Sequence, residues 1–107
     1  MKTALRRLVE LRSLTMDAAL DFGFFESRLN DSFQVLESPV ELMLAECRRL
    51  PAHALREPFS LIFRGPAECF LPQQIYHLRN ERTEPIGIFL VPVGRDAGGF
   101  QYEAIFN

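Results

Sequence analysis

Residues 59–107 alternate apolar and polar side chains in short runs, and Pro or Gly residues separate these runs. One run places Phe59, Leu61 and Phe63 at every second position, and a run with the same period fills residues 100–106. Successive side chains of a β-strand point to opposite faces of the sheet, so this period of two predicts strands with one buried face. We therefore expect the second half of the chain to use most of its aromatic side chains for packing.

The same pattern, read from residue 33 onward, predicts about six strands. The expected strands cover residues 33–37, 40–49, 59–64, 73–79, 86–93 and 100–107, with a loop at 94–99 that makes a terminal hairpin. The strand at 40–49 is expected to be covered on both faces at its start, and the mostly apolar strand at 86–93 to be a buried central strand. Because the connections are short, neighbouring strands should pair antiparallel. The predicted fold is mainly β (α+β), with about six antiparallel strands in a small barrel or strongly bent sheet.

The chain is predicted to be a single domain, with a helical N-terminal segment at residues 1–25 packed on a β-rich core at residues 33–107. Its 107 residues, 48% of them hydrophobic, are enough for one core. Ala4, Leu8 and Leu11 have the spacing of one helix face, which predicts a first helix docked on the domain. The Arg-rich start also fits an organelle transit peptide, which is the less favoured alternative.

A second short helix is expected at about residues 16–22, and one of the helices is expected to cover an opening of the sheet. Gly23 argues against a longer helix, because Gly costs about 1 kcal/mol relative to Ala inside a helix. Phe24 and Phe25 are therefore expected in a turn or strand.

Charge and hydropathy argue against two classes of partner. The net charge is −2, and the basic residues do not gather into a stripe, so nucleic-acid binding is not expected. No run approaches the roughly 18 apolar residues of a membrane span. Cys47 and Cys69 lie beside apolar residues and are expected to be buried, reduced thiols. We expect a soluble, cytoplasmic protein that binds neither nucleic acid nor a membrane.

Catalytic and metal-binding patterns are weak. Cys69 paired with His77 or His53 would make a thiol hydrolase, but no family-specific cysteine signature surrounds it. Cys47 could join these three as a zinc ligand, although no two of the four lie within four residues of each other. We therefore expect no enzyme activity, no metal and no cofactor.

A mixed polar and aromatic cluster is the best candidate for ligand binding. It comprises Gln73, Gln74, Tyr76, His77 and Arg79. Such a mixture can bind a sugar or a peptide through stacking and hydrogen bonds. The alternative is purely structural, because Tyr76 shares a strand face with the apolar residue two positions later.

Four segments together carry a family resemblance. They are FSLIFRGP at residues 59–66, LPQ at 71–73 followed by IY at 75–76, FLVPVG at 89–94 and YEAIFN at 102–107, and Gln74 departs from the family pattern. In these segments the chain resembles a small bacterial domain-of-unknown-function family, the one numbered 6916, mainly over residues 59–107 and more loosely over 33–44. The resemblance implies a compact, mainly β domain of bacterial origin with no assigned catalytic residues. It also implies, weakly, a genomic association with phage-tail-like proteins.

The leading hypothesis is an uncharacterised, non-catalytic structural or protein-interaction domain, linked by gene neighbourhood to phage-tail-like systems. The final strand is expected to offer an exposed edge that pairs with a protein partner or with a second copy of the chain. A small β module that binds a sugar or peptide is the alternative, and a thiol hydrolase that uses Cys69 is third.

Overall fold

The structure is a computed structural model, and it describes residues 20–52 and 57–107. Over these residues it contains one short helix and six strands. They are α2 (Phe22–Glu26), β1 (Ser32–Val35), β2 (Glu41–Arg49), β3 (Phe59–Gly65), β4 (Gln74–Arg79), β5 (Ile86–Asp96) and β6 (Gly99–Phe106). The helix predicted around Ala4 to Leu11 lies outside the described residues. Within the described ranges, no helix is long and apolar enough to cross a membrane.

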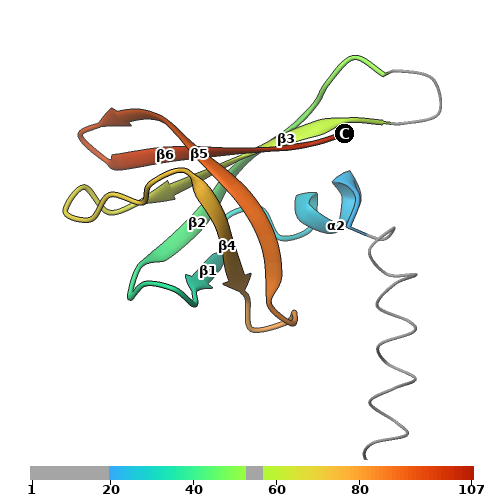
Figure 1. Ribbon diagram of the computed structural model, residues 1–107. Coiled ribbons are helices and arrows are strands. Elements are labelled where there is room, and N and C mark those ends of the chain that lie inside the picture. The colour runs from blue at the N-terminus through green and yellow to red at the C-terminus, as the bar shows by residue number, and fades with distance from the viewer. Residues whose placement is uncertain (1–19, 53–56) are drawn as a thin grey trace, which may run out of the picture.

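All strand pairs are antiparallel, and they close into a ring with the order β1-β2-β3-β6-β5-β4 (Figure 1). The predicted mainly β fold with six antiparallel strands is therefore confirmed. The ring closes where β1, the first strand, pairs with β4. Each of the six strands therefore has a hydrogen-bonded neighbour on both sides.

The exposed edge expected at the C-terminal strand is wrong for most of that strand. β6 pairs with β3 from Phe100 to Phe106, and on its other side it pairs with β5 from Gly99 to Glu103. The reason is topological, because the terminal hairpin places β6 between its sequence neighbour β5 and the distant strand β3. Most backbone groups of β6 are thus already used in the ring.

The core fills the interior of the ring with every second side chain of each strand. The largest fully buried side chains are Tyr102, Phe25, Phe33, Phe63, Leu42, Leu44, Leu61, Leu78, Ile88, Leu90 and Val35. The alternation predicted for β3, β4 and β6 is confirmed by this set. The two-sided burial predicted for β2 and β5 is wrong, since Met43 is 37% exposed and Phe89 is 49% exposed. A ring of strands has one interior, so the outward residues of an apolar run remain at the surface.

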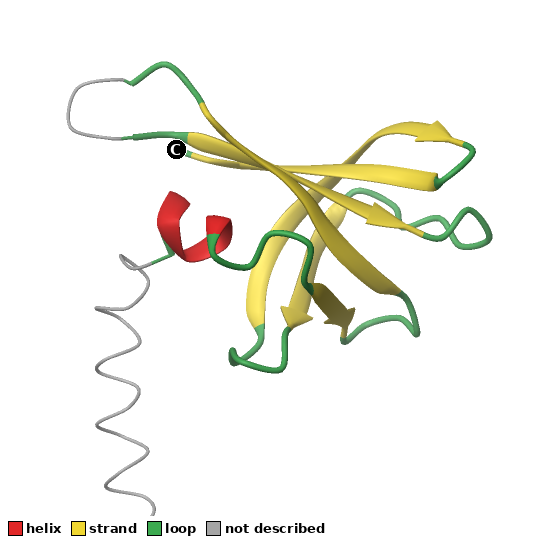
Figure 2. Cartoon of the chain, turned by 180° about the vertical axis from the view of Figure 1, so that it is seen from behind, coloured by secondary structure: helices red, strands yellow, loops and turns green. Residues whose placement is uncertain are grey.

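The short helix packs against one end of the ring (Figure 2). The Asp21 side chain caps it by accepting a hydrogen bond from the Phe24 amide at 2.9 Å. Phe25 is completely buried, and its ring lies 5.2 Å from the ring of Phe106 on β6. The turn or strand predicted for Phe24 and Phe25 is therefore wrong, because both lie in α2, and residues 16–19 of the predicted helix lie outside the described residues. The cap and the burial of one large aromatic side chain, about 2 kcal/mol, offset the cost of Gly23.

The terminal hairpin is tighter than the predicted loop at 94–99. β5 continues to Asp96, which pairs with Gly99, so only two residues form the turn. Gly99 has φ of +122°, and a Cβ atom there would lie 1.9 Å from the carbonyl oxygen of Gly65, so only glycine fits. The Asp96 carboxylate accepts from the Gly98 amide at 2.8 Å and from the Arg64 guanidinium at 2.7 Å. Because of these contacts, β5 and β6 are longer and the loop between them is shorter than predicted.

Candidate functional site

The pairing between β1 and β4, which we call the seam, is the shortest contact of the ring. It has two paired positions, Gln34 with Arg79 and Val35 with Leu78, whereas β3 and β6 share seven. Side-chain contacts extend the seam beyond both ends of this short ladder. The candidate residues of the molecule lie around it.

At one end of the seam, Asn80 joins the turn after β4 to the start of β1. Asn80 is 7% exposed; its Nδ2 atom donates to the Ser32 carbonyl oxygen at 3.0 Å and its Oδ1 atom accepts from the Arg82 amide at 3.0 Å. Arg82 Nη2 donates to Asp31 Oδ2 at 2.8 Å. This charged hydrogen bond holds the pKa of the Asp31 carboxyl below its usual value. Asn80 and Asp31 are therefore polar residues that lock a turn against a strand.

At the other end of the seam, Glu37 binds His77 through both carboxylate oxygens. Oε1 accepts from the His77 backbone amide at 2.9 Å, and Oε2 contacts Nδ1 of the imidazole. The Leu36 amide also donates to the His77 carbonyl oxygen at 2.9 Å. The hydrogen bond with the His77 side chain lowers the pKa of Glu37. The imidazole of His77 is thus engaged in holding β1 and β4 together.

The structure divides the predicted ligand-binding cluster between two sides of β4. Gln73 and Gln74 are exposed at the start of the strand. Tyr76 is only 2% exposed, and its hydroxyl donates to the carbonyl oxygen of Pro72. Burial raises the pKa of this phenol. Stacking of a sugar or peptide on Tyr76 is therefore not supported, because the ring faces the core, whereas Arg79 points outward.

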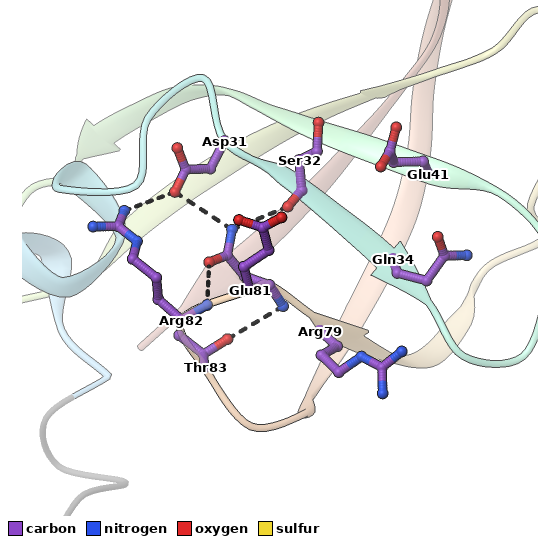
Figure 3. A pocket seen from close by; sticks show the side chains of 9 residues that line it. Asp31, Ser32, Gln34, Glu41, Arg79, Glu81, Arg82 and Thr83 are labelled. Carbon is purple, nitrogen blue, oxygen red and sulfur yellow. Dashed lines mark hydrogen bonds and ion pairs between the residues drawn. The ribbon is translucent and has the colours of Figure 1, made fainter.

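Arg79 lines a polar groove of about 630 Å³ on the outside of the seam. The groove is lined by Asp31, Ser32, Gln34, Glu41, Arg79, Asn80, Glu81, Arg82 and Thr83. Figure 3 shows the Arg79 side chain directed away from the hydrogen bonds of Asn80, on the side of Gln34. The register places Gln34 between Arg79 and Glu41 in one row across three strands. A groove with these groups can bind a polar or charged ligand by hydrogen bonds.

Sequence reasoning selected Arg79 but missed the other groove residues that matter. Asp31 and Asn80 both lie at turns, and 49 positions separate them. Polar residues in turns give a local signal for the turn itself. No signal in the sequence shows that ring closure brings the two turns together.

An exposed apolar pair lies on the outside of the neighbouring hairpin. Ile75 on β4 and Phe89 on β5 are directly paired across the two strands, with exposures of 58% and 49%. Their buried neighbours Tyr76 and Ile88 face the core, so the alternation places both exposed side chains on the outer face. Side chains at directly opposed positions are in contact range. The pair forms one apolar surface that leads, along β4, toward the groove.

Comparison with known proteins places the chain in a family. The model of the family described as a domain of unknown function, DUF6916, matches residues 20–106. The chain belongs to this family. The resemblance that the sequence carried mainly over residues 59–107 is thus confirmed, and the match also covers α2, β1 and β2. No curated protein and no solved structure matches the chain.

The cysteines of this DUF6916 domain are free and partly exposed, rather than fully buried as expected. Burial raises the pKa of the Cys47 thiol to about 11, and the negative charge of Glu26 adds to this effect. Cys69 lies in a second hollow of about 560 Å³, between β2 and the connection that follows β3. The predicted partner His53 lies outside the described residues, and the His77 imidazole binds Glu37. Over residues 20–52 and 57–107, no group of three or more His, Cys, Asp or Glu is arranged to hold a metal ion.

Proposed function

We propose that this DUF6916 domain is a non-catalytic interaction domain that binds a protein partner through the outer face of β4 and β5. The observation that carries the proposal is the exposed pair Ile75 and Phe89, which lie side by side on that face. Aromatic and aliphatic side chains in contact at the surface are typical of the centre of an interface. Covering the half-exposed pair would contribute about 1 kcal/mol for each side chain.

The groups best suited to catalysis are already used for structure, which supports a non-catalytic role. The imidazole of His77 and the carboxylate of Glu37 bind each other, and Asp31 binds Arg82. The Cys47 thiol has its pKa raised to about 11, so it carries little thiolate near neutral pH. A partner within a larger protein assembly would also agree with the gene neighbourhood of phage-tail-like proteins that the family resemblance implies.

The experiment is photocrosslinking in the native host with benzoylphenylalanine placed at position 75. The matched control places it at Glu46, which is exposed on β2, across the ring from β5. We expect a discrete adduct from position 75 and none from position 46. Equal adducts from both positions, or none from position 75, would contradict the proposal.

A second candidate function is supported by the polar groove. Arg79, Gln34 and Glu41 present a cation, an amide and a carboxylate in one row, which suits a polar ligand such as a sugar or short peptide. Amide chemical shifts measured by NMR during titration with sugars would test it. Shifts confined to residues 31–34 and 79–83, and absent with Arg79→Gln, would favour a ligand-binding module over the interaction domain.

A further inference from the structure

The outer face of β4 changes from apolar to cationic along its length. Its outward side chains are Ile75, His77 and Arg79, in that order. At about 3.3 Å per residue, Ile75 and Arg79 lie about 13 Å apart. Gly87 pairs with His77 across the hairpin and carries no side chain, and the His77 imidazole lies beside it, with Cδ2 and Nε2 3.6 Å from the position of a Cβ at residue 87. We call this outer face the track; it has one apolar end and one charged end.

Arg79 differs from the other arginines of the described residues in its contacts. Arg48, Arg49, Arg64 and Arg82 form ion pairs, Arg28 donates to the Phe24 carbonyl oxygen, and Arg95 lies over the Phe100 ring. Over residues 20–52 and 57–107, Arg79 is the one arginine whose side chain makes no ion pair, hydrogen bond or aromatic contact. Gln34 beside it uses Nε2 to donate to Val35 and Val40 carbonyl oxygens, which leaves Oε1 outward. The guanidinium of Arg79 is therefore available to bind an acidic group from elsewhere.

Two sources within the protein fit this requirement poorly. Residues 1–19 contain four basic and two acidic side chains, so their net charge has the same sign as Arg79. A second copy bound about a two-fold axis at His77 would place Ile75 of one copy against Arg79 of the other. The first arrangement brings a net positive charge to Arg79, and the second brings an apolar side chain to it.

We infer that the occupant of this face is an extended acidic segment of a different protein. An apolar side chain of this segment packs on Ile75 and Phe89, and a carboxylate of the segment binds Arg79. The two side chains are four residues apart in the segment, because the rise per residue of an extended chain equals that of β4. Glu41 lies in the same row as Arg79, on β2, with Gln34 of β1 between them. Its negative charge repels a carboxylate placed beyond Gln34, so the carboxylate of the segment stays at Arg79. This inference rests on the proposed function and specifies the chemistry of the partner.

The probe is a nine-residue peptide of Gly, Ser and Thr with Phe at its third position and Glu at its seventh. Two comparison peptides carry Lys in place of Glu, or carry Glu directly after Phe. Titration into the ¹⁵N-labelled full chain, followed by NMR, should shift the amides of both Ile75 and Arg79 with the first peptide. We expect each comparison peptide to bind about fivefold more weakly, the range of a solvent-exposed ion pair, with a difference that shrinks at high salt.

Arg79→Gln should remove the preference for Glu over Lys, and Arg48→Gln should preserve it, because Arg48 lies outward on β2 with a 72% exposed side chain. Equal binding of the Glu and Lys peptides would overturn the acidic partner and leave the interaction face intact. No shift with any peptide, together with an adduct from position 75, would overturn the extended occupant alone. An adduct with twice the mass of the chain would show that the occupant is a second copy of the chain. Absence of any adduct would contradict the proposed function itself.

Discussion

Replacing Asn80 with alanine tests whether side chains hold the ring closed at its shortest contact. The side chain is 7% exposed and makes two hydrogen bonds of 3.0 Å, one to the Ser32 carbonyl oxygen and one from the Arg82 amide. A third contact, to Asp31, is longer at 3.4 Å. A neutral hydrogen bond contributes about 1 kcal/mol net, so Asn80→Ala should lower the free energy of unfolding by about 2 kcal/mol. For a domain of this size the melting temperature should fall by roughly 10 °C.

Urea denaturation followed by far-UV circular dichroism measures this loss. Gln73→Ala is the matched control, because it removes an exposed amide side chain next to β4 and outside the seam. The control should change the free energy of unfolding by less than about 0.5 kcal/mol. A loss from Asn80→Ala as small as that of the control would refute the view that this network holds β1 to β4.

Three further predictions concern the core, the helix and the loss of stability at low pH. Tyr102→Phe removes the acceptor of the Leu71 amide, a buried hydrogen bond of 3.0 Å, so urea denaturation should show a loss of about 1–3 kcal/mol; an unchanged midpoint would contradict this. Gly23→Ala should raise the free energy of unfolding by about 0.5–1 kcal/mol in thermal melts, because the new Cβ would lie 3.7 Å from its nearest neighbour; a lower melting temperature would show hidden strain. Asp31 and Glu37 have lowered pKa values in the fold, so their contribution to stability is present above about pH 4.5 and is lost as the pH falls further. The urea midpoint of a D31N/E37Q variant should therefore vary less between pH 3 and pH 5 than that of the wild type, and an equal fall in both would contradict the assignment.

The strands were predictable because their signal is local. Phe59, Leu61 and Phe63 recur at every second position of the sequence, and the same residues are buried in β3. The apolar run at 86–93 misled the burial prediction, because apolar character alone does not show which face a strand presents to the core. Phe89 was expected inside and is half exposed on the outer face.

The candidate site was predictable only in fragments. Arg79 was selected with Tyr76 because the two are close in sequence, yet they lie on opposite faces of β4. Asp31 and Asn80 were not selected as site residues, since their contact depends on the pairing of β1 with β4. A side chain's partners across a sheet follow from register, and register is a property of two strands rather than one.

The sequence by itself determined the mainly β class, the approximate strands, most of the core side chains and the family. These features depend on hydrophobic periodicity and on motifs within short segments, which are local properties of the sequence. The tertiary structure alone decided that the strands close into a ring, that the final strand is paired on both sides for most of its length, and that Ile75, Phe89 and Arg79 share an outer surface. Those outcomes depend on which distant strands pair, because hydrogen-bonded neighbours in a sheet are chosen by the packing of the whole core.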